Sequence, residues 1–542
     1  MNRLTKEKKI IWSICCFIGL FFLYCLRSPL DFGTSYLWCE DGMILYKEAN
    51  EYGFLSVFHV SNGSLWVIQR FFGWICYSVV NIFNIIRIYP FLLSIITKAF
   101  EVGCVFYFTS EKFSWIIESK WMRLFEVASV LVAVPDTGID VVNCDTSSGF
   151  ICIFAVFLMG LNALRKDEYT DLSVFEILFL VLMALSSLGA PFVFGVALLH
   201  FISFIVHQRL SKEKAVSKAK VRKRLIINII MLALVLLATC MQLLQLMESD
   251  RTSQVSLDLF ERIKSTFLYF VWFPYSNYYY VSIVITLIGI LLWVVISYFT
   301  KANPLVVIYG AGFSSAWLFI CSLSCDYHKM FMPLFDINNR SMNTRLWTLS
   351  YMIAAFYVGC AVYKLWQKNK VVKVIAVIIL IIEIGMLAFH YRVASNGKEE
   401  TYIRAYDNNM AMCDTRGSEE LFIPIGPFEQ GEPFGMYIPV DSISSDTTID
   451  SDIHISSREE FSGRPLHIGL IIEDSGESPV KEAYLKYDDL DYYVGCYRMG
   501  TLDSESGNTI MRLEFMSTAK LEHKEAYELY VLLEDGRIVR VN

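Results

Sequence analysis

Two adjacent acids, Glu40 and Asp41, stand in the stretch "YLWCEDGMILYKEANEY" (36–52), soon after the long apolar run "IIWSICCFIGLFFLYCL". A carboxylate screened from bulk water at such a boundary can act as a general base toward a hydroxyl group, or can help to hold a divalent cation. Acids in front of a helix also cap it and complement its dipole. A capping acid is also a well-held acid, so both interpretations stay open.

A second polar segment, "VPDTGIDVVNCDTSSG" (134–149), lies between two apolar runs and carries Asp136, Asn143 and Asp145. Together with the first pair of acids, these side chains could line a polar cavity and supply oxygen ligands to a cation. The alternative is an ordinary solvated loop with a turn at Asp-Thr-Gly.

Two arginines, Arg340 and Arg345, precede or begin another apolar run in "DINNRSMNTRLWTLSYM" (336–352). A guanidinium at the start of a membrane span can bind a lipid phosphate through a forked, charge-assisted contact. It can equally extend to ordinary lipid head groups.

The composition shows what kind of protein positions these groups. Of 542 residues, 55% are hydrophobic and 19% are charged, whereas soluble globular domains carry about 25% charged residues. Several runs have the length of about 20 apolar residues that crosses a bilayer core. The sequence therefore predicts a polytopic α-helical membrane protein.

Basic residues set the expected threading, because cytoplasmic loops are enriched in Lys and Arg. The clearest mark is "RLSKEKAVSKAKVRKR" (209–224), and the N-terminal tail is also basic. The expected threading has an N-terminus inside, a C-terminus outside and a run 64–85 that lies along the outer surface without crossing. Eleven spans are predicted, near residues 10–28, 88–109, 121–134, 149–164, 172–188, 191–208, 225–246, 278–299, 304–324, 344–364 and 371–391.

The composition changes after Tyr391, where acidic residues outnumber basic ones and short alternating runs recur. The final segment predicts a β-hairpin around Asp535-Gly536. We therefore expect a membrane domain over 1–397, with 29–87 as its first outer loop, and an extracytoplasmic β-rich, sandwich-like domain over 398–542. A disulfide between Cys413 and Cys496 is one option within that domain.

The stretch "WCEDGMILYKEANEYGFLSVF…NGSLWVIQRFF" resembles the first outer loop of a bacterial subgroup of the GT-C superfamily of membrane glycosyltransferases. That loop reads W-x-E-D-G, then a helix, then an apolar-Pro-Arg segment, which here is Gln69-Arg70 without the proline. Two weaker matches are similar to the subgroup's second loop and to its entry into a late span; they are carried by Pro135, Asp136 and Asn143, and by "NTRLW" (343–347). The resemblance covers about residues 1–390.

The resemblance implies an inverting transfer of a sugar from a polyprenyl-phosphate-linked donor to a cell-surface glycan acceptor, at the outer face of a bacterial plasma membrane. It makes Asp41 the best candidate for the general base, with Glu40 second. Arg345, with Arg340 nearby, would bind the donor phosphate. Asp136, Asn143 and Asp145 would shape the acceptor or metal side. Some members of the superfamily use a divalent metal and others do not, so Mg²⁺ or Mn²⁺ stays open.

Other functions are also consistent with a polytopic protein. A lipid-linked glycan transporter or flippase would place charges within its spans; the acids there are few, namely Glu101, Glu126, Glu176 and Glu383. A polysaccharide polymerase or an acyl-transferring enzyme is a further alternative, with His59 as the one histidine in the first loop. No glycine-rich phosphate loop and no sign of a nucleic-acid partner is present in the sequence.

Overall fold

The computed structural model describes most of the chain. The described residues are 2–27, 37, 41–61, 63–133, 148–165, 169–186, 189–210, 218–248, 304–323, 344–367, 370–395, 409–410, 413, 417–425, 434–441, 443, 448–450, 452–461, 466–476, 478–502, 509–521 and 526–541. Contacts divide the chain into two compact units. The first comprises Met1–Pro29, Val57–Gln69 and Thr97–Gly397; the second comprises Leu30–Ser56, Arg70–Ile96 and Lys398–Asn542.

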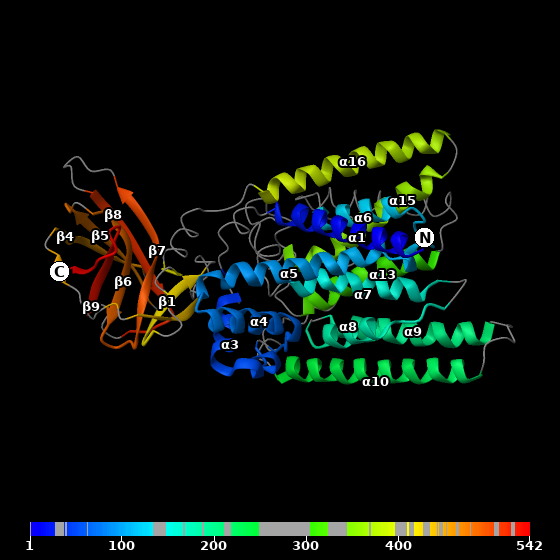
Figure 1. Ribbon diagram of the computed structural model, residues 1–542, viewed down its shortest axis with the longest axis horizontal. Helices are drawn as coiled ribbons and strands as arrows, with labels where there is room; N and C mark the ends of the chain where they lie inside the picture. Colours follow the sequence, from blue (N-terminus) through cyan, green and yellow to red (C-terminus); the bar gives the residue numbers. More distant parts are fainter. Residues whose placement is uncertain are drawn as a thin grey trace. The chain divides into compact units, whose positions relative to one another are not determined.

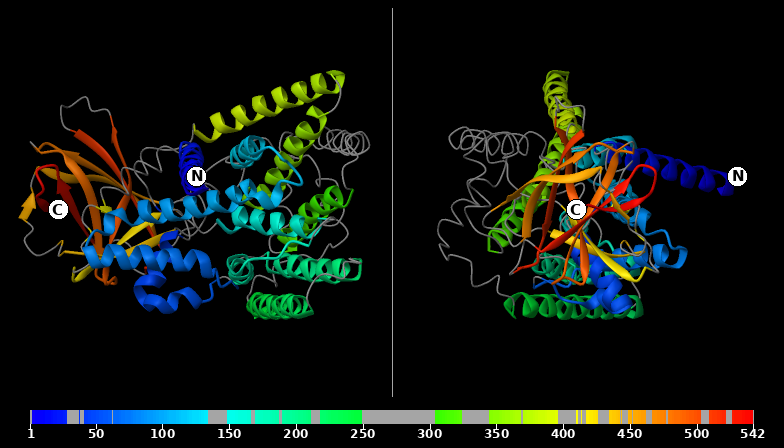
Figure 2. Two further views of the ribbon diagram at one scale, coloured as in Figure 1. Left: turned by 45° about the vertical axis from the view of Figure 1, so that its right-hand side comes forward. Right: turned by 90° about the vertical axis from the view of Figure 1, so that its left-hand side faces the viewer.

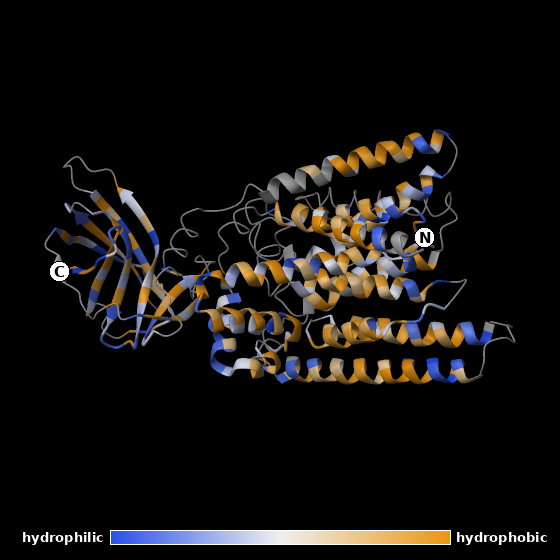
Figure 3. Ribbon diagram, viewed as in Figure 1, coloured by the Kyte–Doolittle hydropathy of each residue, from blue (hydrophilic) through white to orange (hydrophobic). Residues whose placement is uncertain are grey.

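Helices build the first unit, and each predicted span within the described residues is helical (Figure 1). They are α1 (Asn2–Cys25), α6 (Lys120–Ala133), α7 (Gly149–Ala163), α8 (Val174–Ala184), α9 (Ala190–Leu210), α10 (Lys218–Glu248), α13 (Pro304–Leu323), α15 (Thr344–Trp366), α16 (Lys370–Ser395) and the second half of α5 (Tyr89–Phe106). Apolar residues dominate these helices along much of their length (Figure 3). The predicted span 278–299 lies outside the described residues.

Four of the described helical segments are long and apolar enough to cross a membrane. They are Ile86–Thr109, Ala190–Arg209, Ala219–Gln245 and Thr348–Trp366. Six shorter apolar helices accompany them, among them α7 and α8. The structure is therefore that of a mostly helical protein with four candidate membrane-spanning helices among the described residues, while the full set of eleven spans stays a prediction.

Aromatic and polar side-chain contacts hold one set of helix ends together. Trp12 near the start of α1 lies 5.2 Å from Trp121 at the start of α6, between ring centroids. Lys112, in the connection after α5, donates to Glu176 at the start of α8 over 2.6 Å. Arg224 near the start of α10 pairs with Asp171 over 2.5 Å. The start of α1, the end of α5 and the starts of α6, α8 and α10 thus lie together, as the predicted threading requires.

The opposite helix ends are tied together as well. Arg27, just beyond α1, donates to the Leu131 carbonyl near the end of α6 over 2.9 Å. Thr239, in the last third of α10, donates to the Ala190 carbonyl at the start of α9 over 3.2 Å. Helix α4 (Val67–Phe83) begins here, because the Val67 N–H donates to the Leu185 carbonyl behind α8.

Glycines let tyrosine rings lie directly over neighbouring helices. Tyr309 of α13 donates to the Phe157 carbonyl of α7 over 3.1 Å, and its hydroxyl lies against Gly160. Tyr357 of α15 donates to the Val306 carbonyl of α13 over 2.5 Å, and its ring lies against Gly310. Small residues at such positions bring helix backbones close, which is how membrane helices gain packing contacts.

The second unit contains the C-terminal β-rich domain, which confirms the predicted change of structure after the last span. Its strands are β1 (Glu419–Ile425), β2 (Phe434–Val440), β3 (Thr448–Asp450), β4 (Ile453–Glu460), β5 (Leu466–Asp474), β6 (Val480–Tyr487), β7 (Tyr492–Leu502), β8 (Thr509–Ser517), β9 (Tyr527–Leu533) and β10 (Ile538–Val541). They pair in the order β3-β10-β9-β6-β7-β8-β5-β4, and β1 pairs with β2 and β7.

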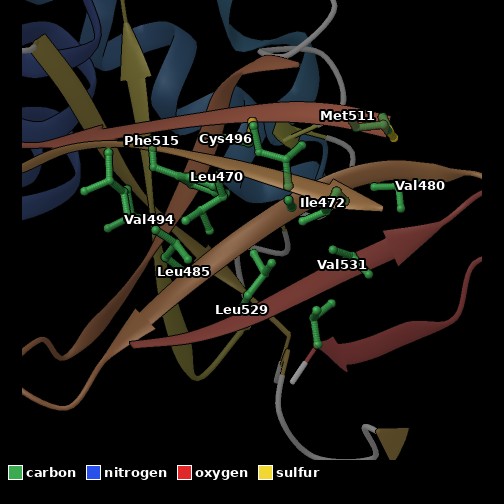
Figure 4. Close-up of a cluster of buried hydrophobic side chains, with 14 of the residues drawn as sticks. Leu470, Ile472, Val480, Leu485, Val494, Cys496, Met511, Phe515, Leu529 and Val531 are labelled. Atoms are coloured by element: carbon green, nitrogen blue, oxygen red, sulfur yellow. The ribbon is translucent and has the colours of Figure 1, made fainter. Parts of the chain in front are cut away.

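Strand β7 joins the two halves of this sheet. Its first residues pair with β1 and β6, and from Cys496 on it pairs with β8, with a bulge between Cys496 and Arg498. Bulges bend strands and increase their twist, which the curved ribbons show (Figure 2). Inward side chains from both halves form one core, among them Leu470, Leu485 and Val531 (Figure 4).

The hairpin predicted at Asp535-Gly536 is confirmed. Strands β9 and β10 pair antiparallel across this turn, and Gly536 has φ of +88°, a conformation that glycine adopts without steric cost. The disulfide option is wrong. Cys413 and Cys496 are both free thiols, because Cys413 directs its sulfur to the Asn409 carbonyl and Cys496 is buried in the core of the strands.

Replacing Gly310 by alanine should destabilise the bundle, because the added methyl group would overlap the Tyr357 ring. We expect a loss of about 1–3 kcal/mol, the usual cost of overpacking. Gly312→Ala in the same helix is the matched control, since nothing lies within 4 Å of the added carbon, and it should be neutral or stabilising. Thermal unfolding in detergent measures both variants, and equal unfolding temperatures would contradict the packing described here.

Candidate functional site

The described residues of the segment 29–87, predicted to be the first outer loop and called the first loop below, include four helical segments that concern the site. They are a π-helical turn η1 (Asp41–Tyr46), α3 (Lys47–Tyr52), a 3-10 turn η2 (Gly53–Phe58) and α4. Gly53, with φ of +57°, separates α3 from η2. The first three segments are too short to be stable alone, because isolated helices below about 12 residues are marginal in water. Tertiary contacts must therefore hold this loop in place.

Asp41 is the first residue of η1 and only 1% of its surface is exposed. An acid in a first helical turn complements the helix dipole, so the structure agrees with the predicted capping position. Gly42 lies against Ile425 of β1 and 3.4 Å from Met436 of β2, measured from the position that its Cβ would occupy. The "DG" pair therefore lets the start of the helical run pack directly on the β-domain.

A buried ion pair fixes the middle of the loop. The Nη1 atom of Arg70 on α4 contacts a carboxylate oxygen of Glu48 on α3 and donates to the Ser56 carbonyl of η2 over 2.9 Å. Arg70 is 2% exposed and Glu48 is 9% exposed. A single side chain of α4 thus holds both α3 and η2.

The charge of Arg70 survives its burial. Desolvation lowers the pKa of its guanidinium to about 10, which still leaves it protonated at neutral pH. Two charges removed from water stabilise a fold only when each has a partner of good geometry. Glu48 and the Ser56 carbonyl supply such partners on one edge of the guanidinium.

Aromatic packing completes the loop core. The ring of Tyr46 lies 5.8 Å from that of Tyr77 and 5.0 Å from that of Tyr89, both edge-on. Burial raises the pKa of the Tyr46 hydroxyl well above its usual range, so it stays neutral. Gly73 of α4 approaches Leu45, with 3.3 Å between its Cβ position and the Leu45 carbonyl. Helix α4 is therefore a platform on which η1 and α3 rest.

A cation–π contact of Lys47 connects the loop to the β-domain. Its Nζ atom lies 5.7 Å from the ring centroid of Tyr437 on β2, a cation–π distance. Lys47 is exposed, as are Asn50 and Glu51. The side chain of Lys47 therefore contacts the β-domain rather than the loop core.

Most of the other predicted site residues cannot be compared with the structure. Glu40, Asp136, Asn143, Asp145 and Arg340 lie outside the described residues. Arg345 lies on the first turn of α15, but its side chain is not among those described. Their grouping with Asp41 therefore remains a prediction.

Glu48 was missed by the sequence analysis, although the sequence carries a signal for it. Ile44, Leu45, Glu48 and Ala49 follow the i, i+3, i+4 spacing of one helical face, and all four are buried. An acid within an apolar stripe of this kind needs a buried cation as partner. Arg70, which the loop resemblance had already marked, is that cation.

Charges inside the helical unit are more numerous than the acids alone suggested. Glu101 and Glu126 are buried, and so are Arg27 and Lys98. Lys98 and Glu101 stand three residues apart near the middle of the span Ile86–Thr109. The expectation of few charges within the spans is therefore incomplete, because it considered acids and not these cations. The side chain of Glu383 lies outside the described residues.

Glu176 has a structural explanation. Its carboxylate accepts from Lys112, from the Tyr107 hydroxyl and from the Ser173 N–H, and the Ser173 hydroxyl accepts from the Glu176 N–H. This is a capping box at the start of α8, strengthened by a cation. Glu176 thus fixes a helix end.

Within the described part of the chain, no group of three His, Cys, Asp or Glu side chains could hold a metal ion. The acids predicted for the metal side are not in that part. Comparison of the chain with protein-family models, with curated proteins and with solved structures gives no match. The functional inference therefore rests on the chemistry of the residues.

Replacing Glu48 by alanine should strongly destabilise the first loop, because Arg70 would keep a buried charge without its carboxylate. Breaking a buried pair in this way costs about 3–5 kcal/mol. Glu51→Ala, an exposed acid three residues further along, is the matched control and should stay within about 0.5 kcal/mol of wild type. Limited proteolysis and thermal unfolding report the effect; equal protection of both variants would contradict the clamping role of Arg70.

Proposed function

We propose that this protein is a membrane glycosyltransferase that moves a sugar from a polyprenyl-phosphate-linked donor to an extracytoplasmic glycan acceptor. Asp41 acts as the general base toward the acceptor hydroxyl, with Glu40 as the second candidate. Arg345, with Arg340, neutralises the phosphate of the leaving polyprenyl phosphate. Asp136, Asn143 and Asp145 shape the acceptor side, and a divalent cation such as Mg²⁺ or Mn²⁺ is a candidate cofactor there.

One observation carries this proposal: the acid of the "CEDG" motif, Asp41, heads a helical run that is buried and anchored rather than solvated. A general base needs a fixed position within hydrogen-bond reach of its proton donor. Here the run is held by Arg70 from α4 and by the contact of Gly42 with β1 and β2. A solvated loop acid would need neither.

The proposed placement in a bacterial plasma membrane rests on the family resemblance, and the proposed orientation rests on the basic segments. The basic segments at one set of helix ends are cytoplasmic by the positive-inside rule, which puts the first loop and the β-domain outside. The donor then enters from the bilayer and the acceptor from the extracytoplasmic side. The β-domain would bind part of the acceptor polymer.

A lipid-linked glycan transporter is the second candidate, because Lys98 and Glu101 are buried mid-span. Ionisable residues at such depth commonly mark a substrate path. In that function Asp41 is only a helix cap, and a chemical step is absent. The two candidates therefore differ in what they require of Asp41.

Binding of undecaprenyl phosphate is the first experiment for the proposed donor. Native mass spectrometry of the purified protein should show saturable binding of undecaprenyl phosphate and weaker binding of undecaprenol, which lacks the phosphate. Arg345→Ala should weaken phosphate-lipid binding by about tenfold, the equivalent of one lost charge-assisted contact. Arg222→Ala, an exposed arginine of α10, is the control. Equal binding of both lipids by all forms would refute a phosphate site.

Asp41→Asn should abolish sugar transfer while leaving expression and unfolding temperature unchanged, because the amide keeps the shape of the carboxylate but cannot accept the proton. The rate should fall by about 10²–10⁴-fold. Glu51→Gln is the matched control on the same helical run and should keep full activity. The rate is measured as sugar transfer in membrane vesicles that are supplied with polyprenyl-phosphate sugars. Near-wild-type turnover of Asp41→Asn would exclude it as the base and favour the transporter.

A further inference from the structure

Arg70 uses only one of its three nitrogens. Nη1 contacts Glu48 and donates to the Ser56 carbonyl. Nε and Nη2 are buried and have no hydrogen-bond partner among the described residues. A guanidinium carries five N–H donors in a fixed fork, so the edge formed by Nε and Nη2 has three donors left. Buried donors of this kind call for an acceptor, which protein, water or ligand must supply.

The free edge matches one class of ligand. Nε and Nη2 form the side of the fork that binds two oxygens of a phosphate or carboxylate at once. The phosphate of the proposed lipid donor offers such a pair of oxygens.

Exposed aromatic rings lie on the two segments that Arg70 joins, η2 and α4. Phe54 of η2 is 50% exposed and Phe71 of α4 is 40% exposed. Both rings contact Trp74, at centroid distances of 4.9 Å and 5.9 Å. Leu55, next to the Ser56 carbonyl that Arg70 binds, is exposed as well. Exposed apolar patches of this kind mark binding surfaces, and aromatic rings are favoured at the membrane interface.

We propose that Arg70 and this aromatic patch bind the phosphate-headed isoprenoid lipid that serves as donor. Nε and Nη2 of Arg70 hold two phosphate oxygens, and the first isoprenyl units lie on Phe54, Phe71 and Trp74. The guanidinium is buried, so the head group must displace the side chains that cover this edge. This site rests on the proposed function and adds a second phosphate contact to it. Glu48 orients the guanidinium and is a positioning residue.

The chemistry distinguishes this lipid from simpler ligands. Inorganic phosphate can use the fork but gains nothing from the aromatic patch. Undecaprenol can use the patch but gains nothing from the fork. Phosphatidylglycerol offers a phosphate with straight acyl chains, and therefore tests whether the site is a general head-group contact. Only a ligand with both parts should bind tightly.

The test compares these four probes on the full-length protein in nanodiscs, by native mass spectrometry and by competition against a fluorescent undecaprenyl phosphate. Arg70→Lys keeps the charge next to Glu48 but loses the fork, and should weaken undecaprenyl phosphate binding by about tenfold. Phe54→Ser changes an exposed side chain, and should weaken undecaprenyl phosphate binding about threefold without changing the affinity for inorganic phosphate. Arg87→Lys and Phe83→Ser, exposed residues of the same loop, are the matched controls.

Each outcome decides. Weaker binding of undecaprenyl phosphate by Arg70→Lys and by Phe54→Ser, with wild-type affinity in the two control variants, supports the site. Wild-type affinity in both variants overturns it while leaving the proposed function intact, since undecaprenyl phosphate then binds elsewhere. Equal affinity for phosphatidylglycerol, with the same dependence on Arg70, overturns the donor assignment. Absence of undecaprenyl phosphate binding by the wild-type protein overturns the proposed function too. If Arg70→Lys fails to fold, Phe54→Ser alone decides between these outcomes.

Discussion

The buried contact of Arg70 with Glu48 and the Ser56 carbonyl is the constraint on which the first loop depends. The segments that it joins are a π-helical turn, a six-residue α-helix and a 3-10 turn, none of which is stable alone. In a low-dielectric environment one charged donor holds two acceptors far more firmly than it would in water. The position of Asp41, seven residues before Glu48 on the same run, follows from this clamp.

The β-domain gives the loop its second support, and most of the loop belongs to the same compact unit as the β-domain. Gly42 packs on β1 and β2, and Lys47 lies over the Tyr437 ring. Chemistry placed on a loop gains precision when a rigid scaffold holds that loop. A sheet rigidified by a core that spans β4 to β10 is such a scaffold. The C-terminal domain is thus a structural partner of the acid motif, and a cut at residue 397 would separate the motif from its support.

How much the sequence predicted depends on the range of the interaction. Helical spans, the turn at Asp535-Gly536 and the strand runs were predictable because their signals are local: apolar length, turn chemistry and alternation. Strand β4, "IHISSREE", was missed because its half-exposed, acidic pattern is weak. The ion pair of Glu48 and Arg70 joins residues that are 22 positions apart in the sequence. The contact of Gly42 with Ile425 joins residues that are much further apart in the sequence. Pairings of this kind depend on tertiary packing, which composition and periodicity do not encode. The buried Lys98 escaped notice because a single cation hardly changes an apolar run.

The contacts at one set of helix ends bear on the choice between the two proposed functions. At one set of helix ends, Lys112 and Tyr107 bind Glu176, Arg224 pairs with Asp171, and Tyr169 donates to Asn228. These contacts tie the connection after α5 to α8 and α10. A transporter that alternates between two open states must separate such contacts in every cycle, and breaking partly buried, charge-assisted bonds is costly. The proposed enzyme would leave this network intact. Lys98 and Glu101 are buried in the same helical protein, and buried charges can also fix how neighbouring helices pack.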